Sequence, residues 1–111
     1  MTEPKENKLP QLSNKQVKYL RGIGHKLSPL VLIGKEGLND KILTAVETEL
    51  DNHELIKVKI GTNSSVDKKN AADILPPSTG SALVQLIGKT LLLYRANPKK
   101  PKDKRILLPK I

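Results

Sequence analysis

The sequence contains no cysteine, phenylalanine or tryptophan, and it has only two tyrosines and two histidines. Without cysteine there is no disulfide framework and no thiolate metal site. Two histidines, His25 and His53, are too few to predict a zinc or iron site. Modules that read single-stranded nucleic acid by stacking bases on a sheet need several aromatic side chains. That mode of binding is excluded, and neither a metal nor another cofactor is expected.

Long hydrophobic runs are also missing. No apolar stretch approaches the roughly 20 residues of a membrane span, and the N-terminal segment MTEPKENKLPQ has no hydrophobic signal region. We therefore expect a cytoplasmic protein with no membrane partner. The 111 residues suit one domain with a modest core, and nothing in them demands more than a monomer.

Positive charge is abundant. Twenty Lys and Arg residues against eleven Asp and Glu give a net charge of +9. Such an excess favours a polyanionic partner, most often nucleic acid, although charge that serves only solubility is the alternative. Because an aromatic platform is absent, nucleic acid would be held mainly through phosphates, backbone amides and shape.

Periodicity and turn signals predict a regular order of elements between residues 12 and 95. In chain order they are a helix at 13–27, a strand at 30–33, a helix at 39–53, a strand at 54–60, a helix at 66–75, and strands at 81–87 and 89–95. The order α-β-α-β-α-β-β predicts an α/β fold. We expect a single-domain two-layer sandwich with a mixed four-stranded sheet.

Local signals set the expected boundaries. Ser13 and Gln16 form a capping-box pattern at the start of the first helix, and Asn39 is the expected N-cap of the second. Pro29 ends the first helix, because a proline disfavours helical geometry in the residue before it. For the same reason the third helix is expected to stop before Pro76 and Pro77.

Both flanks are expected to be weakly ordered. Residues 1–11 lack periodicity and are typical of a flexible lead, and residues 96–111 form a basic, proline-broken tail. The chain from Arg95 onward carries seven basic residues and one acidic residue. Only ILLP, residues 106–109, is apolar enough to dock, and we expect it as an edge strand.

Basic residues gather on particular faces. On the first helix the arc opposite the apolar stripe is basic, and in the strand ELIKVKI the lysines alternate with buried residues. An ordinary solvated surface is the alternative interpretation. The residues predicted to bind nucleic acid on these faces and in the tail are Lys15, Lys18, Arg21, His25, Lys26, Lys57, Lys59, Arg95, Lys99 and Lys100.

The tetrapeptide LIGK occurs twice, at residues 32–35 and 86–89. The second copy leads through a tight turn into a strand, whereas the first leads through G-x-x-G into a helix, so we interpret the repeat as similar strand-end chemistry and not as duplication. Only the first copy has features of an anion site. Its glycines permit close backbone approach, the helix N-terminus favours an anion, and Lys35 can add a charged contact. A turn that merely joins strand to helix is the alternative.

Three stretches, LSNKQVKYLRGIGHKLSPLVLIGKEGLND, HELIKVKI and VQLIGKTLLLYR, together resemble the CRM domain in its bacterial single-domain form, the YhbY-like proteins. The resemblance implies a fold similar to the C-terminal domain of translation initiation factor three. It also implies RNA binding and association with precursors of the large ribosomal subunit. The family's RNA surface includes the loop that here is Gly34, Lys35, Glu36 and Gly37. The double proline departs from the family pattern and leaves the length of the third helix open.

We therefore expect a non-enzymatic RNA-binding protein without a small-molecule substrate. No clustered carboxylates, catalytic triad pattern or metal ligands favour a nuclease, and Glu36 alone is not a useful magnesium site. A general architectural or DNA-binding protein is the main alternative, because its charge would be equally suitable. A protein-interaction module is a further possibility, and its binding would depend little on salt.

Overall fold

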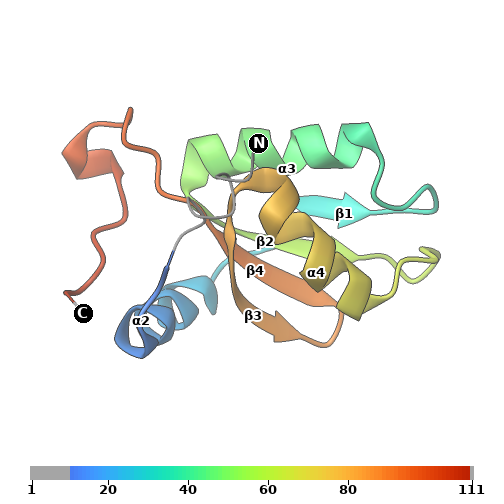
Figure 1. Ribbon diagram of the computed structural model, residues 1–111, viewed down its shortest axis with the longest axis horizontal. Coiled ribbons are helices and arrows are strands. Elements are labelled where there is room, and N and C mark those ends of the chain that lie inside the picture. The colour runs from blue at the N-terminus through green and yellow to red at the C-terminus, as the bar shows by residue number, and fades with distance from the viewer. Residues whose placement is uncertain (1–10, 111) are drawn as a thin grey trace, which may run out of the picture.

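The computed structural model describes residues 11–110. The predicted flexible lead at residues 1–11 therefore lies outside the described residues, except for Gln11. The elements are α2 (Asn14–Gly24), β1 (Val31–Ile33), α3 (Asp40–His53), β2 (Leu55–Ile60), α4 (Lys68–Thr79), β3 (Ala82–Ile87), β4 (Thr90–Tyr94) and a 3-10 helix, η1 (Lys102–Lys104). The predicted order α-β-α-β-α-β-β is confirmed (Figure 1).

The four strands form one mixed sheet, as predicted, and their order in it is β1-β2-β4-β3. β1 runs parallel to β2, and the pairs β2–β4 and β3–β4 are antiparallel. β1 is an edge strand, in which Val31 and Ile33 are buried but Leu32 is 60% exposed. The other face of β1 is therefore open to solvent.

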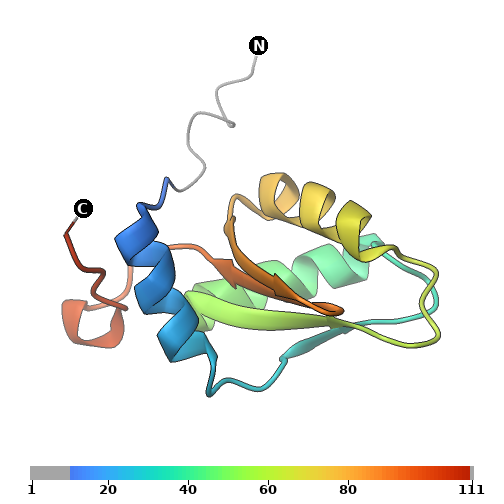
Figure 2. The same ribbon diagram turned by 90° about the horizontal axis from the view of Figure 1, so that it is seen from below.

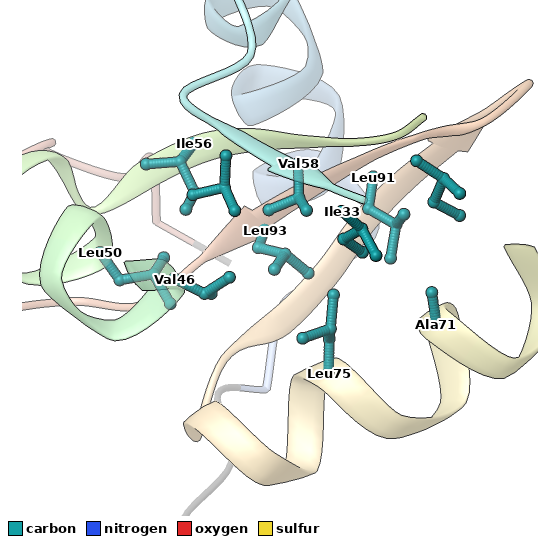
Figure 3. Packing of buried hydrophobic residues seen from close by; sticks show 11 residues of the cluster. Ile33, Val46, Leu50, Ile56, Val58, Ala71, Leu75, Leu91 and Leu93 are labelled. Carbon is teal, nitrogen blue, oxygen red and sulfur yellow. The ribbon is translucent and has the colours of Figure 1, made fainter. Parts of the chain in front are cut away.

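The main core lies between the sheet and helices α3 and α4. Ile56 and Val58 of β2 and Leu93 of β4 point toward Leu50 of α3 and Leu75 of α4, and all five are fully buried (Figure 3). Strand alternation explains this arrangement, since every second residue of β2 reaches the same face. The remaining residues of β2 and β4 face the opposite side of the sheet.

Helix α2 covers part of that opposite side. Leu20 packs there in a second core with Leu92 and Tyr94, and Ile106 and Leu108 of the C-terminal segment pack against the same cluster. The capping box predicted at the start of α2 is confirmed. The helix is shorter than predicted: it ends at Gly24, and a turn follows at His25 and Lys26. Figure 2 shows α2 beside the C-terminal segment.

Helix α4 is longer than predicted, because it continues through Pro76 and Pro77 to Thr79. Each proline removes one helical N–H donor, but the surroundings hold the last turn in place. Leu75, Pro76 and Thr79 are buried, and Gly80 ends the helix in the left-handed region at φ +65°. Burial and this cap outweigh the local signal on which the prediction depended.

The C-terminal segment also differs from its prediction. Residues 96–105 were expected to be weakly ordered, yet the backbone N–H of Asn97 and the side chain of Lys100 both donate hydrogen bonds to α3 or its cap. Residues 106–109 form no strand, although Ile106 and Leu108 do dock on the second core. The expected edge strand is wrong, because these residues pack by their side chains rather than by pairing with the sheet.

Candidate nucleic-acid interface

A groove runs between α2 and the face of the sheet that α3 and α4 leave open. It consists of two adjoining hollows of about 250 and 530 Å³, which share Gln85 and Ile87 of β3. The first hollow lies over the sheet, and its lining includes Lys57, Lys59 and Thr90. The second lies against α2. We call the two together the α2–sheet groove.

The groove brings together five of the predicted basic residues. Lys18, Arg21 and His25 line its α2 side, and Lys57 and Lys59 line its floor. On α2 they are spaced three and four residues apart, which places them on one stripe of the helix. The basic face of α2 and the basic face of β2 therefore form one surface, although the two segments are more than thirty residues apart in sequence. Lys15 on α2 and Lys26 in the turn after the helix are exposed, but neither lines the groove.

Neutral groups separate these cations. The amide of Gln85 and the hydroxyl of Thr90 lie in the groove, and Ile87, which is 58% exposed, adds an apolar patch. Sequence reasoning missed these three residues. The pairing of β3 with β4 shifts register between Leu83 and Gln85, and simple alternation therefore could not assign the face of Gln85.

The G-x-x-G segment forms a tight turn after β1. The N–H of Gly37 donates to the carbonyl of Gly34 over 3.1 Å, and Lys35 and Glu36 at its tip are exposed. Gly37 adopts φ +70°, where glycine is favoured, and a Cβ there would lie 3.1 Å from Val66. Gly34 has open space around it. Only the second glycine is therefore required by the turn itself.

The N-terminus of α3, next to this turn, is already capped. The Asn39 side-chain oxygen accepts the N–H of Ile42 over 3.0 Å, as the sequence predicted, and Asp40 occupies the first turn. Glu36 in turn accepts a long hydrogen bond of 3.4 Å from the Asn39 amide. Two carboxylates close to the helix end reduce its attraction for an anion. Lys35 is thus the main feature of the turn that favours a phosphate.

The turn lies at the end of the sheet, outside the groove lining. The N–H of Gly61, which follows β2, donates to Ile33 at the end of β1, and the N–H of Ile60 donates to Lys89 in the β3–β4 turn. The exposed side chains of Lys35 and Lys89 therefore belong to the same end of the sheet. Lys59, on the groove floor, immediately precedes Ile60, the last residue of β2 at this end of the sheet.

Two of the three predicted basic residues at the C-terminal end are engaged within the protein. The Arg95 guanidinium donates to the carboxylate of Asp51 over 2.6 Å and to the carbonyl of Thr79 over 2.7 Å. Lys100 donates to the carbonyl of Asn52 over 2.7 Å, while Lys99 is exposed. Arg95 fixes β4 to α3 and α4, so its charge is largely directed inward.

The described residues show no further type of site. Between residues 11 and 110, no group of three or more His, Cys, Asp or Glu side chains is placed to hold a metal ion. The helices of that part of the chain are all too short or too polar to cross a membrane.

Comparison with known proteins places this arrangement in a family context. Residues 12–95 match the model of the CRS1 / YhbY (CRM) domain. The chain is 40% identical over 92 residues to "Probable RNA-binding protein PA4753" of Pseudomonas aeruginosa, covering 83% of this chain and 88% of the relative. It is 38% identical over 98 residues to "Probable RNA-binding protein YqeI" of Bacillus subtilis, covering 88% of this chain and 99% of the relative.

A solved structure agrees with the fold. The solution structure of the hypothetical protein SAV1595 from Staphylococcus aureus superposes with a TM-score of 0.72 at 40% identity, and the match covers 89% of this chain and 100% of that chain. The expected α/β fold and the resemblance to the CRM domain are both confirmed.

Proposed function

The chain belongs to the CRS1 / YhbY (CRM) domain family, and on that premise we propose that it binds RNA and catalyses no reaction. The names of its relatives support RNA as the partner. The observation that carries the proposal is the α2–sheet groove, in which five basic residues from α2 and β2 line one continuous surface.

Binding in this groove would be electrostatic and largely independent of sequence. Lysine and arginine displace the cations condensed on an RNA backbone, so affinity falls as salt rises. Lys57 and Lys59 on the floor and Arg21 on the helix would contact phosphates, while Gln85 is a neutral donor and acceptor within reach of a base edge or a 2′-hydroxyl. Lys35 would add a phosphate contact at the end of the sheet.

We further propose that the RNA is ribosomal RNA in a precursor of the large ribosomal subunit, and that the protein acts in the cytoplasm. The resemblance to the bacterial single-domain members supports this. Sedimentation of a cell extract tests it directly, since the protein should travel with large-subunit precursors at low salt. A protein that stays at the top of the gradient under these conditions would refute the ribosomal assignment but not RNA binding.

Removing the two floor lysines tests the groove. Lys57→Gln with Lys59→Gln should weaken binding to transcribed large-subunit ribosomal RNA at least tenfold, which corresponds to about 1.4 kcal/mol. The dependence of affinity on salt should become shallower, because two fewer counterions are released. Fluorescence anisotropy at several salt concentrations measures both.

The matched control is Lys68→Gln with Lys69→Gln. These lysines are exposed on α4, which packs on the other face of the sheet, and the change in charge is the same. We expect a loss of less than about threefold, since only the long-range field changes. Equal losses in the two variants would show that net charge alone matters, and the groove would then not be the binding site.

The same assay separates the alternatives. Duplex DNA that displaces the RNA at equal concentration would favour a general nucleic-acid-binding protein over an RNA-binding one. Labelled RNA that shortens during incubation with magnesium would reveal a nuclease. We expect neither, because the groove supplies cations and an amide but no pair of carboxylates.

A further inference from the structure

Glu54 is a charged residue in an unusual position. It caps the C-terminal end of α3, is only 1% exposed, and is the one non-glycine residue with positive φ, +66°, among residues 11–110. Both of its carboxylate oxygens accept backbone hydrogen bonds from the C-terminal segment. The N–H of Asn97 donates over 2.6 Å, and the N–H of Ile106 donates over 2.7 Å.

These two bonds close a loop, which we call the clamped loop and define as residues 97–106. Further anchors lie at its base: the Asn97 side chain donates to the carbonyl of Asp51, and Ile106 packs on the second core. Between the anchors the loop contains η1 and five basic residues against one acidic residue, Asp103. The exposed cations of the loop are Lys99, Lys102 and Lys104.

The hydrogen bonds of the Glu54 carboxylate compensate for two energetic penalties at this position. A backbone with φ +66° favours glycine and is strained for other residues, and a buried carboxylate loses its hydration. Both penalties would disappear with glycine at this place. The hydrogen bonds to Asn97 and Ile106 are what glycine could not supply, and charge-assisted bonds of this kind are among the stronger ones. Burial and this carboxylate also raise the pKa of the neighbouring Tyr94 hydroxyl.

The clamped loop lies far from the G-x-x-G turn. That turn precedes the N-terminus of α3, whereas Glu54 follows its C-terminus, and Figures 1 and 2 show the two at opposite ends of the molecule. The 14 residues of α3 separate them by about 21 Å at 1.5 Å per residue. On α3, the acidic side chains of Glu47 and Asp51 are both paired with Arg95.

We propose that Glu54 is a positioning residue that holds the clamped loop as a second, preformed contact surface for RNA phosphates. The inference depends on the proposed function, because it assigns a further part of the protein to the same ligand. A loop that is ordered before it binds loses less conformational freedom on binding. Glu54 thus raises affinity without touching the RNA.

The test separates the effect of holding the loop in place from the effect of its positive charge. Glu54→Gln keeps the shape of the side chain and every lysine, but its amide nitrogen cannot accept a backbone N–H, so one anchor is lost. We expect trypsin to cut after Lys102 and Lys104 about tenfold faster, since cleavage follows local opening. RNA affinity should fall about fivefold because the loop must now be ordered on binding. The salt dependence should not change, because no cation has been removed.

The matched variant removes charge and leaves the clamp. Lys99→Gln, Lys102→Gln and Lys104→Gln together should also lower affinity, but here the salt dependence should become shallower. A merely structural role for Glu54 would speed cleavage in Glu54→Gln and leave RNA affinity unchanged, which would overturn the proposal.

A second route to an open loop guards against loss of folding in Glu54→Gln. Glu54→Gly removes the carboxylate and at the same time relieves the strained backbone, and Ile106→Ala with Leu108→Ala loosens the loop from its other anchor. Both should reproduce faster cleavage and weaker binding at constant salt dependence. Wild-type protein that shows no salt-dependent RNA binding would refute the proposed function itself, whereas normal binding by these opened variants would refute only the role of Glu54.

Discussion

Gly22 and Gly24 of α2 stand two residues apart in opposite surroundings. Gly24 is buried against β4, and a Cβ there would lie 2.6 Å from Leu92 Cδ2. Leu92 is itself only 3% exposed, so its side chain has little room to move away. Gly22 is exposed, and a Cβ there would meet nothing within 4 Å. Only Gly24 sets the distance between helix and sheet.

Substituting each glycine by alanine should therefore change stability in opposite directions. Gly24→Ala overfills a packed contact and should lower the free energy of unfolding by about 1–3 kcal/mol. Gly22→Ala adds helix propensity in open space and should raise it by up to about 1 kcal/mol. Urea denaturation followed by circular dichroism measures both. Changes of the same sign would contradict the close packing of α2 on β4.

At the scale of elements, the prolines of α4 are the least expected feature. Pro77 is exposed near the end of the helix, and it lacks the N–H that would donate to the carbonyl four residues earlier. Pro76 differs from it because its ring is buried. The two neighbours therefore share the same backbone defect but not the same packing.

Pro77→Ala is expected to stabilise the protein. The helix propensity of alanine exceeds that of proline by about 3 kcal/mol, and the more flexible unfolded chain offsets up to about 1 kcal/mol of this. We expect a net gain of about 1–2 kcal/mol in the urea denaturation assay. Pro76→Ala is the comparison and should gain less, because it also removes buried ring contacts. A loss of stability in Pro77→Ala would mean that the last turn is not helical in solution.

The elements that could be predicted are those set by nearby residues. Ser13 and Gln16 bond to each other three residues apart, and Asn39 caps a helix through Ile42, so the sequence contains both partners of each bond within one turn. The alternation of β2 identified Lys57 and Lys59 as one face. Local signals were misleading in α4, where tertiary burial of Pro76 supports a turn that proline alone disfavours.

The parts that could not be predicted depend on distant contacts. The clamped loop looked disordered because its anchors lie 43 and 52 residues away at Glu54. The α2–sheet groove was predicted only as two separate basic faces, since their meeting depends on how α2 crosses the sheet. Arg95 was expected to contact RNA, but nothing near it in sequence indicates its bond to Asp51.

The molecule has basic side chains at both ends, Lys35 at one and the clamped loop at the other. This arrangement predicts that affinity depends on the length of the RNA. Lys35 and the clamped loop are separated by at least the length of α3, about 21 Å, which is roughly six steps along one strand of a duplex at about 3.4 Å per step. An RNA of about four nucleotides should reach one end only. An RNA of about twenty nucleotides should reach both and gain from the second contact.

Two variants distinguish contact at one end from contact at both ends: Lys35→Gln and the triple lysine variant of the clamped loop. With the short RNA each should weaken binding by no more than about twofold, because the α2–sheet groove and the other end remain available. With the long RNA each should cost about tenfold, since the linked second contact is lost. Fluorescence anisotropy with two labelled RNAs gives both values. Equal losses at the two lengths would show that the ends act independently.

The second core also has a consequence for the order in which the chain is made. Of the described elements, α2 leaves the ribosome first, yet the second core that holds Leu20 is complete only when Leu92, Tyr94 and finally Ile106 have been synthesised. The main core needs nothing beyond Leu93. A nascent chain can therefore form the sheet with α3 and α4 before α2 has packed fully on it. Because α2 is one wall of the groove, a partly synthesised chain lacks the surface that would hold RNA, and the protein gains that surface only as its last residues emerge.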